Sequence, residues 1–209
     1  MNAWVPTVAA LALFPAVVEL ARRRRLLAGG ETPRKIVHVG AALLAVPLPF
    51  VLSFRAIALV GISFAVLFAV SRRAAILAAV HDVDRRTYGE VLFPLGITAV
   101  ALLYPERHLF LYGLLVLGLA DGLAAPIGLR FGRRRLPGGK TEWGSATFFC
   151  VAALAGALVL TCSGHAPATV AGVALGAAAC LTVVESLLPG GFDNLVLPTV
   201  SAALVAVLL

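Results

Sequence analysis

The chain has 209 residues, of which 61% are hydrophobic and 13% are charged. A water-soluble globular domain of this length does not ordinarily have such a composition, so lipid is the expected solvent for most of the chain. The net charge of +7 does not indicate a nucleic-acid partner, because the basic residues stand in short clusters and are not interleaved with aromatic residues.

Apolar segments, separated by charged clusters and by Gly, Pro or Asn, predict an all-α polytopic integral membrane protein with about eight short transmembrane helices. These spans consume most of the chain, so a single transmembrane domain over residues 1–209 is expected, in which residues 1–25 form an N-terminal helix and a basic stop. The predicted spans are 3–20, 36–53, 55–70, 89–104, 108–126, 145–162, 167–187 and 195–209.

Lysine and arginine are crowded in alternate connections. Six lie in residues 21–35, four in 71–88 and five in 127–144, whereas Arg55 and Arg107 are alone in the connections between them. This is the positive-inside pattern, so we predict that both termini lie outside. The segments predicted to face the cytoplasm, the last of them by parity alone, are 21–35, 71–88, 127–144 and 188–194.

The start of the second span contains polar side chains that can share one helix face. Thr32 and Pro33 are typical of an N-cap and a first helical position. Arg34 and Lys35 then fall in the first turn, with His38 about one turn further on. Cations there oppose the helix dipole, and a bound phosphate would offset that conflict. Alternatively, these cations are only topology signals and anchors to lipid headgroups.

Asp121 stands in an apolar segment, 117–126, with no basic residue nearby in the sequence. A carboxylate inside a membrane is costly unless it faces a cavity, a partner or a metal. The structural alternative is a buried interhelical ion pair. Glu185, late in the seventh span, and Asp193, just before the eighth, add hard oxygen ligands of the kind that suits Mg²⁺, although Asp193 also fits a helix N-cap.

The connection before the sixth span combines glycines, cations and hydroxyl groups. Gly128 and Gly132 precede the run Arg133–Arg135, and Lys140 and Thr141 stand just ahead of the span. A helix N-terminus and a lysine ammonium can cradle a polyphosphate, so Lys140 is predicted to bind phosphate, and the arginine run is predicted to contact anionic lipid. The glycines allow close approach of a ligand, but they are also typical helix-packing residues in membranes.

All even-numbered spans are predicted to enter from the cytoplasm, so the polar groups at their N-termini can converge there. Helix dipoles, cations and carboxylates at one place are typical of a metal–nucleotide site. The pairs at these four N-termini are Arg34/Lys35, Gly89/Glu90, Lys140/Thr141 and Asp193/Asn194.

In this order the polar segments resemble the CTP-dependent lipid-alcohol kinases, the family of dolichol kinase, phytol kinase and the CTP-using diacylglycerol kinase. The resemblance covers residues 33–200 as a kinase-like core. One departure is Ala120 before Asp121, where a glycine is expected. The segments that carry the resemblance are Arg34-Lys35-x-x-His38, Arg86 to Glu90 with Phe93-Pro94, Asp121-Gly122, Gly128, Gly132, Lys140-Thr141-Glu142, Glu185, and Asp193-Asn194 with Pro198.

The resemblance implies transfer of the γ-phosphate of CTP, with Mg²⁺, to the hydroxyl of a membrane lipid such as a polyprenol, phytol, dolichol or diacylglycerol. The expected partners are therefore CTP, the lipid alcohol and membrane lipids, and the sequence is compatible with a homodimer. The residues assigned to catalysis are Arg34, Lys35, His38, Asp121 and Lys140. Those assigned to the nucleotide are Arg34, Lys35, Gly122, Gly128, Gly132, Lys140, Thr141 and Asn194, and those assigned to the metal are Asp121, Glu185 and Asp193.

Two alternatives follow from the same residues. A phosphatidate cytidylyltransferase would also use CTP, but its expected late signature, a Lys-Asp pair and a His-Gly-Gly stretch, is missing from this sequence. A small membrane transporter would also place ionisable residues inside the membrane. It would need polar groups at several depths, whereas the polar residues here gather at one end of the predicted spans.

Overall fold

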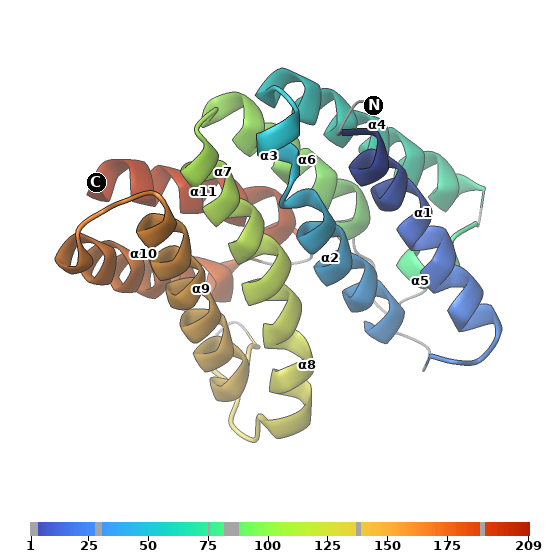
Figure 1. Cartoon of the computed structure of the whole chain (residues 1–209). Helices are drawn as coiled ribbons and strands as arrows, with labels where there is room; N and C mark the ends of the chain where they lie inside the picture. The colour runs from blue at the N-terminus through green and yellow to red at the C-terminus, as the bar shows by residue number, and fades with distance from the viewer. Residues whose placement is uncertain (1–3, 28–30, 75, 82–87, 137–138, 189–190) are drawn as a thin grey trace.

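The computed structural model describes the whole chain except residues 1–3, 28–30, 75, 82–87, 137–138 and 189–190 (Figure 1). Within the described ranges the chain is helical and has no β-strand, only one bridge between Arg135 and Thr141. Among the described residues, six helices are long and apolar enough to cross a membrane, and two shorter apolar helices accompany them. The predicted all-α, polytopic class is therefore confirmed.

The helices correspond closely to the predicted spans. One helix runs without a break through α7, the π-helical segment η1 and α8, so the fifth predicted span continues to Phe131. The elements are α1 (Trp4–Arg23), α2 (Glu31–Ala45), α3 (Leu48–Val51), α4 (Phe54–Arg73), α5 (Ala78–His81), α6 (Gly89–Leu103), α7 (Arg107–Leu115), η1 (Val116–Asp121), α8 (Gly122–Phe131), α9 (Glu142–Cys162), α10 (Pro167–Leu187) and α11 (Asp193–Leu208).

Two details differ from the prediction. The helix α2 begins at Glu31, so Thr32 lies inside its first turn and is not the N-cap. The second span is also divided, because α2 ends at Ala45 and the short α3 begins at Leu48. Pro47 lies between them and explains the break, since proline supplies no N–H group to a continuing helix.

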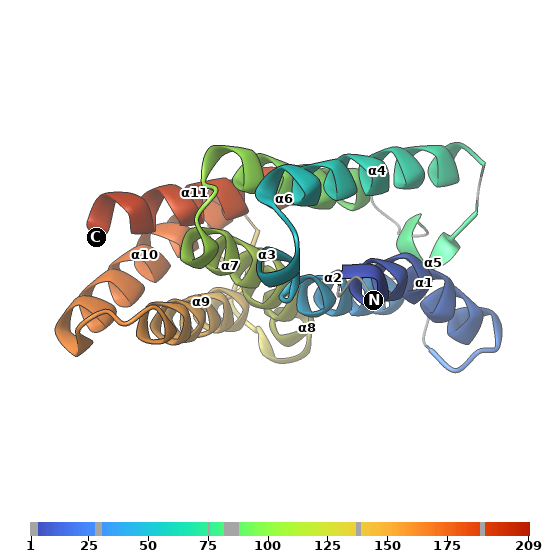
Figure 2. The same cartoon turned by 45° about the horizontal axis from the view of Figure 1, so that its top comes forward.

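The continuous helix of α7 and η1 forms the centre of the bundle. Its side chains Phe110, Leu114 and Leu117 are fully buried. The helices α2, α9 and α11 pack around it, α10 packs on α9, and α4 packs on α6. Figure 2 shows that α1 and α2 lie in one layer and α4 and α6 in another. The two layers face each other across a cavity.

Small residues allow the central contacts. A Cβ atom added to Gly118 would lie 2.0 Å from the Cβ of Ala42, so the backbone of η1 packs directly against the Ala42 methyl group of α2. A Cβ atom on Gly96 would lie 2.1 Å from the Asn194 carbonyl oxygen, so the two short helices α6 and α11 also meet closely. Close packing of small residues is a common source of helix association in lipid, where the hydrophobic effect does not drive helices together.

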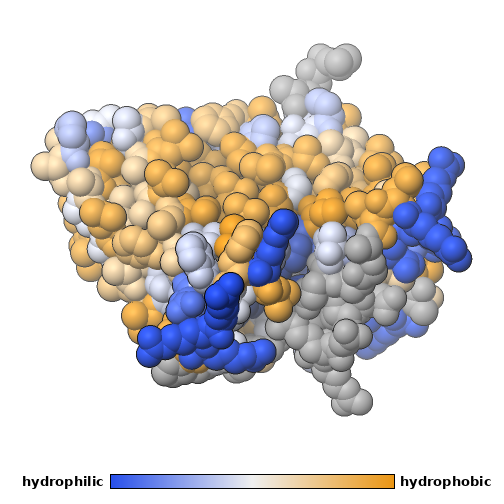
Figure 3. All heavy atoms as spheres, turned by 90° about the horizontal axis from the view of Figure 1, so that it is seen from below, coloured by the Kyte–Doolittle hydropathy of each residue, from blue (hydrophilic) through white to orange (hydrophobic). Residues whose placement is uncertain are grey.

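The outer surface is apolar along the helices and basic at one end. Figure 3 views the molecule from that end and shows several separate hydrophilic patches (blue) next to the hydrophobic surface (orange). The arginines Arg24 and Arg25 after α1 and Arg133–Arg135 after α8 are exposed. This arrangement matches the basic connections on which the predicted topology depends; the membrane side itself stays a prediction.

Candidate active site

Lys35 and Asp121 form a buried ion pair between α2 and the end of η1. The Lys35 Nζ donates to Asp121 Oδ2 at 3.0 Å and to the Asp121 backbone carbonyl at 3.2 Å. Lys35 is 8% exposed and Asp121 is 5% exposed. The carboxylate that was isolated in the sequence therefore has a cationic partner from another helix, which offsets part of its cost in the membrane.

The π-helical segment positions Asp121. A π segment within an α-helix shifts the register of the side chains that follow, and such segments are frequent at functional sites. Asp121 is the last residue of η1, and the α-helix resumes at Gly122. A Cβ on Gly122 would lie 2.5 Å from Val39 Cγ2, so this glycine lets α2 approach the carboxylate. This π-helical segment was not predicted from the sequence.

His38 extends the pair toward the interior. Its Nε2 lies 2.8 Å from the Leu117 carbonyl oxygen and 3.5 Å from Asp121 Oδ2. A carbonyl oxygen can only accept, so Nε2 is the donor and, in the neutral ring, Nδ1 is the nitrogen with a free lone pair. The ring also packs edge-on against Phe93 of α6, with centroids 4.6 Å apart. The imidazole is therefore held in orientation with one acceptor nitrogen.

A second ion pair joins Lys140, in the connection before α9, to Glu185 of α10. Glu185 is 3% exposed, and its Oε2 is buried without a hydrogen-bond partner in the described part of the chain. The backbone of Lys140 is held in place, because its carbonyl accepts from Leu136 N at 2.8 Å. The sequence predicted roles for both residues but not that they pair.

The start of α11 lies close to both pairs. The Asp193 carboxyl group lies within electrostatic range of Asp121, Lys140 and Lys35, and Lys140 also lies within that range of Asp121. Asn194 is buried; its Nδ2 donates to the Gly191 carbonyl at 3.2 Å, and its Oδ1 has no partner among the described residues. The two ion pairs and the start of α11 thus form one polar cluster.

Thr141, just before α9, packs against Gly128 of α8 and against Gly132, which follows α8. The Thr141 hydroxyl is the N-cap of α9 and accepts from Gly144 N at 3.2 Å. A Cβ on Gly128 would lie 2.5 Å from Thr141 Oγ1, and one on Gly132 would lie 2.5 Å from Thr141 Cβ. In the structure, Gly128 and Gly132 therefore give α8 room to pack against the start of α9, and nucleotide contact by these residues stays a prediction.

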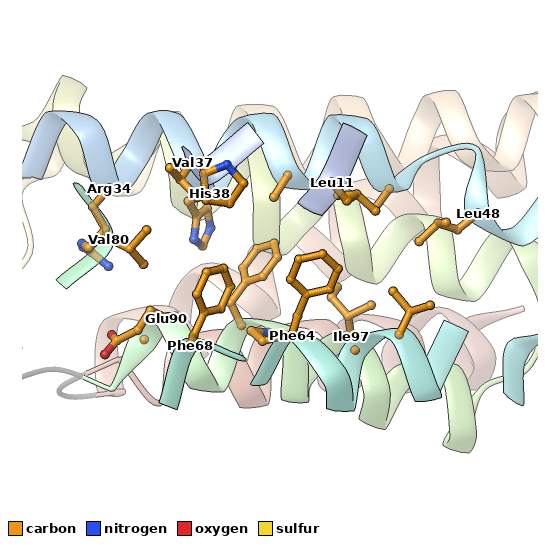
Figure 4. A pocket seen from close by; sticks show the side chains of 18 of the residues that line it. Leu11, Arg34, Val37, His38, Leu48, Phe64, Phe68, Val80, Glu90 and Ile97 are labelled. Atoms are coloured by element: carbon orange, nitrogen blue, oxygen red, sulfur yellow. The ribbon is translucent and has the colours of Figure 1, made fainter. Parts of the chain in front are cut away.

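Arg34 lies on a different side of α2 from Lys35. It lines a cavity between the two helix layers, and Figure 4 shows Arg34 and Glu90 at the same end of that cavity, with His38 next to them. Glu90 is buried and forms an ion pair with Arg72 of α4, a residue that sequence reasoning did not select. Two residues of the predicted 86–90 segment, Arg86 and Thr87, lie outside the described residues.

The metal prediction rests on Asp121, Glu185 and Asp193. In the ranges that the structure describes, no group of three or more His, Cys, Asp or Glu side chains is close enough to hold a metal ion. Mg²⁺ in phosphoryl-transfer sites is usually held by one or two carboxylates together with substrate phosphates. One oxygen each of Glu185 and Asn194 is buried without a partner among the described residues, and both are hard acceptors of the kind that Mg²⁺ prefers. The residues present therefore fit a Mg²⁺ ion that is held mainly by the nucleotide phosphates.

Comparison with known proteins identifies the family. No protein-family model matches the chain, and no solved structure matches it. A phytol kinase of Synechocystis sp. is 31% identical over 209 residues, an alignment that covers 95% of this chain and 89% of the relative. The chain belongs to the phytol kinase family. The alignment spans nearly the whole chain, so it includes every element of the polar cluster.

Proposed function

We propose that this protein is a membrane-embedded kinase that transfers the γ-phosphate of CTP to the hydroxyl of phytol or a related prenyl alcohol. The observation that supports this most is the meeting of Lys35, His38 and Asp121 with the Lys140–Glu185 pair in one cluster. Membership in the phytol kinase family supports a lipid alcohol as acceptor. The positive-inside pattern supports a site that faces the cytoplasm, where nucleotides are available.

The cluster has the charges that a nucleotide triphosphate needs. In the proposed complex, Lys140 and Lys35 neutralise phosphate oxygens, and the positive end of the α9 helix dipole adds to their charge. Asp121, together with Glu185 or Asp193, would hold Mg²⁺, which supplies charge neutralisation between the phosphates when it is bound. Most of the catalysis in such a reaction comes from positioning and electrostatic stabilisation, which a buried, preorganised cluster can supply.

The proposed transfer is a single displacement. The alcohol oxygen forms a bond to the γ-phosphorus, the bond from that phosphorus to the β,γ-bridging oxygen breaks, and CDP leaves with the bond's electron pair. The alcohol proton passes to Nδ1 of His38, because Nε2 is already the donor to Leu117. Asp121, 3.5 Å from Nε2, stabilises the imidazolium that results. In this proposal His38 is the general base.

Two other functions predict different products. A cytidylyltransferase would move the CMP part of CTP onto phosphatidate and release pyrophosphate. A transporter would move a solute without consuming CTP. The structure offers the transporter little support, because the ion pairs Lys35–Asp121 and Lys140–Glu185, each between different elements, belong to one cluster.

The test is a matrix of donors and acceptors with purified protein in liposomes and Mg²⁺. CTP and ATP labelled in the γ-phosphate are each incubated with phytol, a polyprenol or diacylglycerol, and α-labelled CTP is incubated with phosphatidate. We expect γ-label in the lipid phase with CTP and phytol. Label in lipid only from α-labelled CTP and phosphatidate would contradict the proposal, as would no transfer from any donor.

A further inference from the structure

An apolar groove lies beside the polar cluster. It spans about 770 Å³, including its open side, between the α1–α2 layer and the α4–α6 layer. Apart from Arg34, His38 and Glu90, the described residues that line it are apolar or glycine. Figure 4 shows these three at one end and Leu48 at the other. The groove therefore has one polar end and one long apolar body.

The polar end adjoins the candidate active site through His38. This residue lines the groove and, at the same time, lies 3.5 Å from the Asp121 carboxylate. Phe93 packs on the imidazole ring and also lines the groove. A hydroxyl group at this end would thus meet the proposed general base, while the rest of the molecule lay among apolar side chains.

The groove is also accessible from lipid. The helix α1 packs on α2 and α5, and α4 packs on α6, but α1 and α4 make few contacts with each other. Side chains on the outside of both helices, such as Leu13 on α1 and Leu59 on α4, are exposed and apolar, as expected for lipid-facing positions. A hydrocarbon chain can therefore enter sideways between α1 and α4.

We propose that this groove binds the single hydrocarbon chain of the acceptor, with the hydroxyl at His38 and the chain running toward Leu48. This assignment rests on the proposed kinase function and gives a structural reason why the acceptor is a single-chain prenyl alcohol and not diacylglycerol. The groove wall from Arg34 to Leu48 is about 20 Å long. This length exceeds the thickness of the hydrocarbon layer of one leaflet, so the groove is long enough for an extended hydrocarbon chain. One groove with one polar end matches a lipid with one chain and one hydroxyl.

A chain-length test can locate the alcohol in the groove. Ala45 lines the groove two turns beyond His38, so the variant Ala45→Trp shortens the space for the chain. Leu43 of the same helix is 51% exposed, so Leu43→Trp adds the same side chain on the outside. We expect Ala45→Trp to raise KM for phytol about tenfold, by displacing two or more methylene groups, and to leave KM for the short alcohol geraniol unchanged. Leu43→Trp should behave like wild type with both.

A binding experiment without nucleotide separates this assignment from the kinase function. A photoreactive phytol analogue is crosslinked to the protein in liposomes, and the labelled residues are mapped by mass spectrometry. Label on Phe64, Phe68 or Phe93 is expected, and Ala41→Phe, a second narrowing variant, should reduce it. Label confined to outward residues such as Leu59 would overturn the groove assignment.

The outcomes are distinct. If wild type phosphorylates phytol but Ala45→Trp matches Leu43→Trp, the groove assignment is wrong and the kinase function stands. If wild type phosphorylates diacylglycerol as well as phytol, the single-chain assignment is wrong. If wild type phosphorylates no alcohol, the kinase function fails, and the crosslinking map still decides whether a single chain occupies the groove.

Discussion

Two buried carboxylates in this membrane protein are satisfied in opposite ways. Glu19 accepts from Arg22 and Arg23, three and four residues further along its own helix, and from Ala79 N at 2.7 Å. Asp121 takes its cation, Lys35, from a helix that is far away in the sequence. Both carboxylates are about equally buried.

The difference shows how a structural acid can be distinguished from a candidate catalytic one. Glu19 has donors on both oxygens, and its bond to Ala79 fixes the short α5 against α1. The acids of the polar cluster are brought together by tertiary packing and include an oxygen, Glu185 Oε2, without a partner among the described residues. A local network stabilises the fold, whereas a convergent and incompletely satisfied one is suited to bind a ligand.

The largest effect is expected from Lys35→Met. It removes the cation that pairs with Asp121 and that would neutralise the transferred phosphoryl group, so kcat for phytol should fall about 100- to 1,000-fold. Arg24→Met removes an exposed cation from the same end of the molecule and serves as the control. Wild-type turnover by Lys35→Met, at equal amounts of monodisperse protein, would remove this lysine from the site.

A smaller effect is expected from Glu185→Gln. Losing one charge-assisted contact corresponds to roughly a 10- to 100-fold loss of kcat/KM for CTP. If the free Glu185 oxygen serves Mg²⁺, the Mg²⁺ concentration that gives half-maximal rate should rise as well. A Mg²⁺ titration that superimposes on that of wild type would restrict Glu185 to positioning Lys140.

Glu19→Gln should affect stability and not catalysis. The amide can no longer accept on both sides from Arg22 and Arg23, and the expected loss is about 1–3 kcal/mol of unfolding free energy. Thermal unfolding in detergent measures this loss, and the transfer rate per folded molecule should equal that of wild type. A large loss of turnover without a change in stability would make Glu19 part of the site.

The predicted membrane topology can be tested by cysteine labelling, and the substitutions used are expected to leave activity unchanged. After Cys150, Cys162 and Cys180 are replaced by alanine, a cysteine is placed at Arg134 or at Ser163, both of which are exposed. An impermeant thiol reagent should label position 134 in inside-out vesicles and position 163 in right-side-out vesicles. The reverse pattern would place the polar cluster on the outer face.

The fold was largely predictable from the sequence, because segment length and hydropathy define membrane helices and short connections leave few arrangements. The positions of Asp121 and Glu185 inside apolar segments were also informative, since a charge there needs a reason. The pairing of Lys140 with Glu185 was not predictable, because it depends on how α9 and α10 pack. The π segment that ends at Asp121 and the groove between helix layers were missed for the same reason, as neither has a local signature.

The most direct test of the account compares Asp121→Asn with Glu19→Gln in one assay, the transfer of label from γ-labelled CTP to phytol by equal amounts of folded protein. We expect Asp121→Asn to lose nearly all transfer while the protein remains folded, and Glu19→Gln to keep its rate. Substantial transfer by Asp121→Asn would contradict the assignment of the polar cluster as the active site.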